Sequence, residues 1–312
     1  MDMIELSGVT KRYGLKTAVR ELTCVIRPGL VTGFLGPNGA GKSTTMRMIL
    51  GLDRPTAGRA LVEGRPYALL RDPLTVVGAL LEARSVHPGR TAYHHLLCLA
   101  QSNGIPRRRV GEVLDLVGLG AVGARRPKGF SLGMGQRLGI ASALLGDPRI
   151  LIFDEPVNGL DPEGIHWVRN LIRRLASEGR TVFVSSHLMS EMALTADHLI
   201  VIGQGQLLAD TSMAGFIEEN ARSYTRVRSP DREKLLDALS HAGLDAAPSG
   251  APGAEGAWEL EGDRTAVVGE LAAERRLVLH ELGHHRASLE EAFMRLTSQS
   301  VEYQAHVGAE EG

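Results

Sequence analysis

The sequence predicts an α/β fold, with a mostly parallel sheet covered by helices on both faces and a smaller α+β domain after it. Strand and helix patterns alternate from residue 1 to about 215, which is typical of such a sheet. Between about Glu82 and Leu145 the strand pattern gives way to helical periodicity, which indicates an inserted helical subdomain. Beyond residue 220 the predicted elements become shorter. We therefore expect a large domain over 1–218 with a helical subdomain at about 82–145, a small domain over 219–300, and a flexible tail over 301–312.

The helices and strands of the large domain are predicted from apolar runs and from the residues that begin and end them. Val31–Leu35 is a short apolar run before a glycine-rich turn, and apolar residues at helical spacing follow until Gly51. Ile150–Phe153 is continuously apolar, as expected for a strand buried on both faces. Asp161 is a suitable N-cap before Pro162, and it precedes an apolar stripe of Ile165, Val168, Ile172 and Leu175. Thr181–Ser186 is the next predicted strand.

The small domain is predicted from shorter patterns. Ala246–Gly256, rich in Ala, Gly, Pro and Ser, is expected to be a flexible loop. Ser288 and Glu291 form a capping box that predicts a closing helix. The other expected elements are a strand over Tyr224–Arg228, a helix from Pro230, a strand over Trp258–Leu260, a helix around Ala266–Arg275 and a strand over Leu277–Leu282.

Composition narrows the class of function. The 312 residues are 43% hydrophobic, enough for one large core and a smaller one. A net charge of -1 gives no broad basic face of the kind that binds nucleic acid, so no nucleic-acid partner is expected. Two distant cysteines, Cys24 and Cys98, indicate neither a disulfide framework nor a zinc site. No apolar run approaches the roughly 18 residues that cross a bilayer, so we expect a soluble, cytoplasmic protein.

The segment Gly36–Ser43, with the sequence GPNGAGKS, matches the phosphate-binding loop pattern between a strand and a helix. Its glycines let backbone N–H groups turn toward phosphates at a helix N-terminus. Lys42 is expected to reach the β- and γ-phosphates and Ser43 to ligate Mg²⁺. The alternative is a glycine-rich turn that binds nothing, which the flanking strand and helix disfavour.

Two adjacent carboxylates, Asp154 and Glu155, follow the buried strand at Ile150–Phe153. Ligands of open α/β sheets bind at the carboxyl ends of the strands. Asp154 is therefore expected in the Mg²⁺ sphere and Glu155 on the attacking water, because metal ligation and base catalysis need separate carboxylates. Alone, such a pair is more often a cap or a surface pair. Because a phosphate-binding loop precedes this pair in the sequence, we interpret the two carboxylates as site residues.

Four ordered motifs carry a family resemblance. Phe130–Arg137 (FSLGMGQR) resembles the signature sequence of ABC transporter ATPases, and it lies just before residues 150–156 (ILIFDEP). Asn158–Pro162 (NGLDP) resembles the D-loop, and the segment ending at His187 (VSSH) resembles the switch-histidine motif. The resemblance implies a P-loop NTPase cassette with a RecA-like core that hydrolyses ATP. It also implies a homodimer that holds two ATP molecules between the copies.

The resemblance assigns roles to single residues. Ser131 and Gly133 would touch the γ-phosphate of the partner copy's ATP, Asp161 would link the two sites, and His187 would contact the γ-phosphate and the catalytic water. Tyr13 would stack on adenine, its alternative being an ordinary turn tyrosine. The nucleotide-binding loop would comprise Gly36, Pro37, Asn38, Gly39, Ala40, Gly41, Lys42, Ser43 and Thr44.

Several positions depart from the common family pattern. Leu132 and Met134 stand where glycine and glutamine are usual, and this form resembles a subgroup of bacitracin- and daunorubicin-resistance exporters. Glu82 stands at the position of the Q-loop glutamine, where it would lie beside Mg²⁺; the alternative is a solvated glutamate. The segment Ser288–Thr297 (SLEEAFMRLT) is similar to the C-terminal part of drug exporters.

These expectations combine into one hypothesis. The chain is expected to be an ATPase subunit that is peripheral on the inner face of the cell membrane and powers a separate permease exporting an antibiotic, drug-like compound or peptide. One alternative is an ABC ATPase of DNA repair or translation without a membrane partner. Repair proteins would show a long coiled-coil insertion and translation proteins generally two cassettes, and the sequence has neither. The other alternative is an importer subunit, which would work with an external binding protein.

Overall fold

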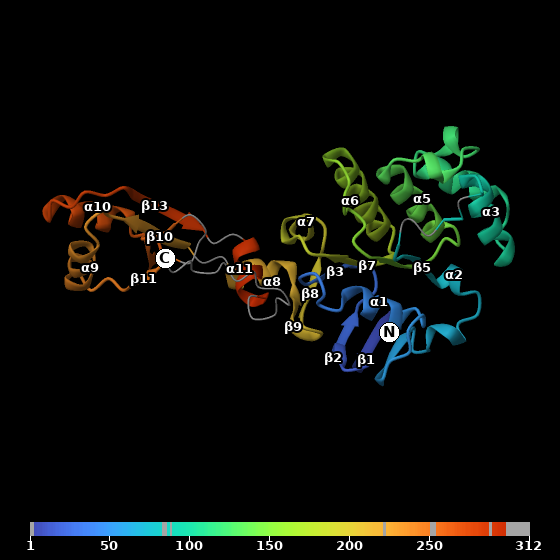
Figure 1. Cartoon of the computed structure of the whole chain (residues 1–312), viewed down its shortest axis with the longest axis horizontal. Coiled ribbons are helices and arrows are strands. Elements are labelled where there is room, and N and C mark those ends of the chain that lie inside the picture. The colour runs from blue at the N-terminus through green and yellow to red at the C-terminus, as the bar shows by residue number, and fades with distance from the viewer. Residues whose placement is uncertain are drawn as a thin grey trace, which may run out of the picture. The chain divides into compact units, whose positions relative to one another are not determined.

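The computed structural model describes residues 3–82, 86–87, 89–220, 223–249, 254–286 and 289–297. The chain forms two compact units, which meet in sequence between Met213 and Ala214 (Figure 1). The first unit contains β1 (Ile4–Tyr13), β2 (Lys16–Ile26), β3 (Val31–Leu35), α1 (Lys42–Ile49), β4 (Ala57–Val62), α2 (Pro73–Val76), β5 (Val77–Leu80), α3 (Ala92–Ser102), α4 (Arg108–Leu116), α5 (Leu132–Leu144), β6 (Ile150–Phe153), α6 (Pro162–Ser177), β7 (Thr181–Ser186), α7 (Met189–Ala193), β8 (His198–Gly203) and β9 (Gln206–Ser212).

Two sheets build the first unit. The larger sheet has the order β5-β6-β7-β3-β8-β9 and is parallel except for the antiparallel strand β9. The smaller sheet is antiparallel, with the order β2-β1-β4. The three strands predicted from apolar runs are confirmed as β3, β6 and β7, and every residue in them is buried. They lie side by side, so the segments that follow them emerge at one edge of the sheet.

Helices cover both faces of the larger sheet (Figure 1). On one face, α1 contributes Met46 and Ile49 to a core cluster that also holds Phe34, Phe183 and residues of the smaller sheet. On the other face, α6 packs on β3 and β7. Its buried residues Val168, Leu171, Ile172 and Leu175 include three of the four predicted for its stripe. The predicted mostly parallel sheet with helices on both faces is therefore confirmed.

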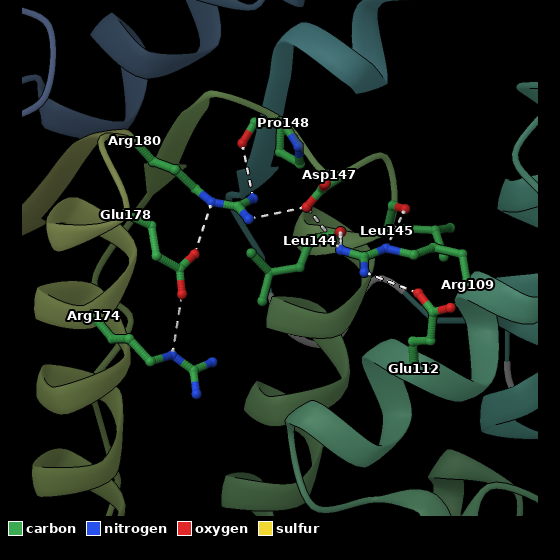
Figure 2. A network of polar contacts seen from close by, with 9 residues as sticks. All are labelled: Arg109, Glu112, Leu144, Leu145, Asp147, Pro148, Arg174, Glu178 and Arg180. Atoms are coloured by element: carbon green, nitrogen blue, oxygen red, sulfur yellow. Dashed lines mark hydrogen bonds and ion pairs between the residues drawn. The ribbon is translucent and has the colours of Figure 1, made fainter.

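The helices α3, α4 and α5 pack on one another between β5 and β6 in the sequence, as the loss of strand signals predicts. A charged network ties this helical insert to the sheet (Figure 2). Arg109 of α4 donates to the carbonyls of Leu144 (3.1 Å) and Leu145 (3.3 Å) at the end of α5, and it pairs with Asp147 at 3.0 Å. Asp147 also pairs at 3.0 Å with Arg180, which directly precedes β7. The carboxyl end of α5 is thus fixed both to α4 and, through Asp147, to the start of β7.

The second unit, Ala214–Leu296, is a small α+β body. Its sheet is antiparallel with the order β11-β12-β10-β13, and the sheet and its two helices follow one another as β-α-β-β-α-β, which is the ferredoxin-like arrangement. Val227, Leu235, Leu239, Trp258, Leu260 and Val268 form its core. Its elements, with the helix that leads into it, are α8 (Met213–Asn220), β10 (Ser223–Arg228), α9 (Arg232–His241), β11 (Ala246–Pro248), β12 (Trp258–Glu261), α10 (Thr265–Glu274), β13 (Glu281–Arg286) and α11 (Leu289–Thr297).

Two predicted starting points in this unit, one of a helix and one of a strand, need correction. The helix expected from Pro230 begins at Arg232, because Asp231 caps it. The strand expected over Leu277–Leu282 is instead β13, since Leu277 and Leu279 are partly buried against the core before pairing with β10 begins at Glu281.

The predicted loop over Ala246–Gly256 is wrong at its start. Ala246–Pro248 pairs with β12 as an edge strand, where a proline is tolerated because its missing N–H faces outward. The closing helix is present as α11, whereas Ser288 of the predicted capping box lies outside the described residues.

Candidate functional site

The turn from Gly36 to Gly41 joins the buried strand β3 to the N-terminus of α1. Backbone from other strands approaches it so closely that side chains do not fit. A Cβ atom would lie 2.5 Å from the carbonyl oxygen of Ile202 at Gly36, and 2.5 Å from that of Ala18 at Gly41. Gly41 also has a φ of 103°, which favours glycine. The turn therefore presents its N–H groups and the positive end of α1, an arrangement suited to phosphate.

Lys42 is the first residue of α1 and is only 6% exposed. Its Nζ donates to the carbonyl of Gly36 at 2.6 Å and to that of Pro37 at 3.3 Å, and it lies 3.2 Å from Oε1 of Glu155. The ammonium group is thus held at the inner rim of the turn. A cation in this place faces whatever anion the turn binds.

Asp154 and Glu155 leave the end of β6 and meet Ser185 of β7. The hydroxyl of Ser185 donates to Oδ1 of Asp154 at 2.5 Å and accepts from the backbone N–H of Glu155 at 2.8 Å. Glu155 has a φ of 47°, in the left-handed region where few non-glycine residues lie. Ser185 thus fixes one carboxylate directly and the other through its backbone. No sequence motif pointed to Ser185 as a site residue, although it stands two residues before His187 at the end of a predicted strand.

His187 follows β7 and contacts the second carboxylate. Its Nδ1 lies 2.8 Å from Oε2 of Glu155, whose other oxygen is the partner of Lys42. Glu155 and His187 are 20% and 32% exposed, so solvent still reaches both. The three predicted catalytic residues therefore form one continuous polar chain.

A hollow of about 400 Å³, the phosphate-side hollow, lies over this chain. Glu155 contributes to its wall from the segment after β6, Tyr13 from the end of β1, and Ala18 from β2. The predicted adenine-stacking residue and the predicted phosphate residues thus share one wall, as a nucleotide requires. The full lining is Tyr13, Lys16, Ala18, Asn38, Gly39, Ala40, Gly41, Lys42, Ser43, Thr44 and Glu155.

The remaining predicted residues gather elsewhere. Ser131 is the N-cap of α5 and accepts from the N–H of Met134 at 3.2 Å. Asp161 is the N-cap of α6 and accepts from the N–H of Gly164 at 2.8 Å. Both line, with Gly133, a second hollow of about 190 Å³, the signature-side hollow. No described residue lines both hollows.

Two contacts involve residues of the signature segment. Leu132, the unusual residue of the signature, is 39% exposed and lies against Gly159: a Cβ atom at Gly159 would be 2.6 Å from Cδ2 of Leu132. Gln136 is buried and donates to the carbonyl of Pro156 at 2.7 Å, which links α5 to the residue after Glu155. Gln136 could not be recognised as a linking residue from the sequence, because its partner lies twenty positions away.

The predicted metal ligands are hard oxygen donors, the kind that Mg²⁺ prefers. Ser43 lines the phosphate-side hollow with Glu155, and Asp154 directly precedes Glu155, so this pair fits a magnesium ion bound with phosphate. Glu82 is exposed and lies just beyond β5, which pairs with β6 through Leu80 and Phe153. It leaves the sheet at the edge that carries Asp154, but it does not line the hollow. Among the described residues, no three His, Cys, Asp or Glu side chains gather as a metal cage.

Comparisons with known proteins identify similar chains. The family model described as ABC transporter matches residues 19–158, and a domain of unknown function matches residues 223–290. An uncharacterized ABC transporter ATP-binding protein of Bacillus subtilis is 35% identical over 97% of this chain and 99% of its own length. A bacitracin transport ATP-binding protein of Bacillus licheniformis is 40% identical over 75% of this chain and 77% of its own. A lantibiotic transport ATP-binding protein of Streptococcus pyogenes is 38% identical over 68% and 92%.

Solved structures agree in fold. An ATP-binding subunit of an ABC transporter matches with a TM-score of 0.63 and 26% identity, over 70% of this chain and 92% of its own. A dimeric post-hydrolysis ATP-binding cassette bound to ADP and Pi matches with a TM-score of 0.62 and 26% identity, over 68% and 99%. Within the described residues, no helix has the length and apolar character needed to cross a membrane.

Proposed function

Because this chain belongs to the family of ABC transporter ATP-binding proteins, we propose that it powers a separate membrane permease that exports an antibiotic, a drug-like compound or a peptide. The chain is an ATP-binding ATPase of this family. The names of the bacitracin and lantibiotic transport relatives support the cargo class. The cassette, over residues 1–218, works at the inner face of the membrane, while residues 219–300 form an accessory domain and 301–312 a tail. The permease handles the cargo.

ATP occupies the phosphate-side hollow. The N–H groups of Gly36–Gly41 and the positive end of α1 bind the phosphates, and Lys42 neutralises the β- and γ-phosphate charge. Ser43 and Asp154 hold Mg²⁺, with Glu82 near it, and the ion supplies charge neutralisation to the transferred group when bound. Ser185 keeps the Asp154 carboxylate aimed, since its hydroxyl donates to that group.

Glu155 is the base that orients and polarises the attacking water. Its side chain lies between Lys42 and His187, so its two oxygens have fixed partners and its direction is set. His187 fixes Glu155 and contacts the γ-phosphate as charge develops there. Phosphoryl transfer needs positioning and charge stabilisation more than covalent chemistry, and this polar chain supplies both.

One observation carries the dimeric part of the proposal: the two hollows of one chain share no described residue. Ser131, Gly133 and the N-terminus of α5, whose N–H groups suit an anion, lie at the signature-side hollow, which no residue of Gly36–Thr44 lines. A second copy placed against it supplies the missing loop. Each ATP is then held by the phosphate-side hollow of one copy and the signature-side hollow of the other, with Asp161 between the two sites.

The test is ATP-dependent association. The Glu155→Gln variant with ATP and Mg²⁺ should be a dimer by light scattering. Adding Ser131→Arg should leave a monomer that still binds fluorescent ATP, because the phosphate-side hollow of each copy is intact. Ser177→Arg, at an exposed position near the end of α6, is the matched control and should dimerise. A Ser131→Arg chain that dimerises fully would contradict the shared site.

The exporter part has its own test. Chain purified from its source membranes with a tag should bring a multi-span membrane protein with it, and the ATPase rate of that complex should respond to the cargo. Purification without any membrane protein would favour the ABC ATPases that work without a permease. A complex that also needs an external binding protein would favour import.

A further inference from the structure

The Tyr13 ring is held by more than the strand that carries it. Tyr13 ends β1, and its side chain is 47% exposed, which would ordinarily leave an aromatic ring free to turn. Here its hydroxyl donates to Oδ2 of Asp53 at 2.9 Å and has a further hydrogen bond with the side chain of Thr44. Partial burial and this carboxylate raise the pKa of the Tyr13 hydroxyl, so it stays protonated as a donor.

Asp53 is itself fixed from α1. The Nε of Arg47 lies 2.7 Å from the same Oδ2, and the backbone N–H of Asp53 bonds to the carbonyl of Arg47 at 3.3 Å. The hydrogen bond from Arg47 lowers the pKa of the Asp53 carboxyl, which keeps it ionised as a strong acceptor. The oxygen that holds Tyr13 is therefore attached to the helix that begins at Lys42.

Lys11 holds the ring from another direction. Its Nζ lies 4.9 Å from the centre of the Tyr13 ring, within the range of a cation–π contact, and donates to the carbonyl of Arg54 at 2.8 Å. Thr56 extends the attachment, since its hydroxyl accepts from the N–H of Arg12 at 3.0 Å. The segment after α1 thus fastens the whole end of β1.

One face of the ring is free for a ligand. Tyr13 lines the phosphate-side hollow, but Lys11 does not, so the cation covers the ring from outside the hollow. We propose that Asp53, assisted by Arg47 and Lys11, is a positioning residue that sets the tilt of Tyr13 and presents its uncovered face to the purine base. This rests on the proposed ATP site. The Tyr13 ring and the helix α1 then move together, because Arg47 of α1 holds Asp53 and Asp53 holds the Tyr13 hydroxyl.

A positioning role makes a specific kinetic prediction. Asp53 contacts the base only through Tyr13, and the base does not change during phosphoryl transfer. Loss of Asp53 should therefore weaken ground-state and transition-state binding alike, which raises KM and leaves kcat unchanged. One net hydrogen bond corresponds to about a three- to tenfold rise in KM for ATP.

The experiment compares Asp53→Ala with Tyr13→Phe, which keeps the ring but removes the hydroxyl. Each should raise KM for ATP about three- to tenfold, and the double variant should be no worse than Tyr13→Phe alone, because that variant already removes the contact with Asp53. Inhibition by inorganic tripolyphosphate, which has no base, should be unchanged. Asp53→Asn keeps an acceptor oxygen and should restore most of the affinity.

Glu63→Ala is the matched control. Glu63 is 22% exposed and paired with Arg149, as Asp53 is 18% exposed and paired with Arg47, but of the two only Asp53 bonds to Tyr13. Its variant should keep wild-type KM. An Asp53→Ala chain with unchanged KM, with equally weakened tripolyphosphate binding, or with an effect that adds fully to that of Tyr13→Phe would overturn the proposal. Wild-type chain that binds no ATP would instead overturn the proposed function.

Discussion

The two units use their strands in opposite ways. All residues of β6 in the first unit are buried, whereas β10 in the second alternates between more and less buried positions. A parallel sheet covered by helices on both faces disfavours charged side chains along its strands, and β3, β6 and β7 contain no Asp, Glu, Lys or Arg, while an antiparallel sheet can keep one face polar. The charged groups of the site in the first unit therefore follow the strand ends.

Charged groups differ between the units for the same reason. Arg226 on the sheet of the second unit lies 2.9 Å from the hydroxyl of Tyr224, 3.2 Å from Glu259 and 3.9 Å from Glu281. These charges balance one another along a strand face. Lys42 and Glu155 in the first unit also pair, but they line a hollow. A cluster of charges indicates a binding site only where a cavity accompanies it.

The same substitution in both charge clusters tests whether only the cluster at the hollow is a functional site. Glu155 and Glu259 are 20% and 26% exposed, and each pairs with a cation. Glu155→Gln should lower ATP turnover about 10²- to 10⁴-fold, the usual contribution of a general base. Glu259→Gln should leave turnover unchanged. Phosphate release measures both, and equal rates for the two variants would remove Glu155 from catalysis.

Truncation of a core side chain in each unit tests whether the two units unfold independently. Phe183→Ala should cost about 3–5 kcal/mol, because this fully buried ring also packs on Phe34 with ring centres 5.0 Å apart. Leu239→Ala in the second unit should cost about 2–5 kcal/mol. Urea unfolding with and without ATP distinguishes the unfolding of the first unit from that of the second. ATP should still protect the first unit of the Leu239→Ala chain, and its failure to do so would show that the units unfold as one.

Two adjacent serines at the end of β7 differ in whether they contact the site. Ser185 and Ser186 are both buried, but only Ser185 contacts Asp154; Ser186 accepts from the N–H of Leu188 at 2.9 Å. Losing a hydrogen bond to a charged group costs about 1.5–3 kcal/mol. Ser185→Ala should therefore lower kcat about tenfold or more, and Ser186→Ala should change only stability. Steady-state kinetics and thermal melting separate these effects, and equal kcat values would contradict a role for Ser185.

What the sequence could predict depended on how local each signal was. Ile150–Phe153 is a continuous apolar run followed by two carboxylates, so both the strand and the site residues after it could be predicted from the sequence. The contact of Ser185 with Asp154 could not be predicted, because it depends on the register that pairs Phe153 with Val184. The hydrogen bond of Tyr13 to Asp53 also spans forty positions.

The second unit shows the same limit for its fold. Ala246–Pro248 has the composition of a loop, and only its pairing with β12 makes it a strand. Leu277 and Leu279 have strand composition, yet they are partly buried in the core as the chain leaves α10. Burial and pairing with distant residues decided both cases, against local propensity.

The smallest expected effect comes from two helix caps with the same local role. Asp161 accepts from Gly164 N–H at 2.8 Å at the start of α6, and Asp231 accepts from Lys234 N–H at 3.2 Å at the start of α9. Either Asp→Ala change should lower the melting temperature of its own unit by a few degrees, and Asp→Asn should restore it. Only Asp161→Ala should also slow ATP turnover, because only that cap lies in the signature-side hollow.

Acid offers a check on the Asp231 cap. The hydrogen bonds from Lys234 lower the pKa of Asp231, so the carboxylate stabilises the folded unit above its unfolded pKa of about 3.9 and loses that effect as the pH falls through the lower folded value. The melting difference between wild type and Asp231→Ala should thus be full at neutral pH and shrink below about pH 4. A difference that is constant across this range would mean that the cap acts without its charge, as an asparagine would.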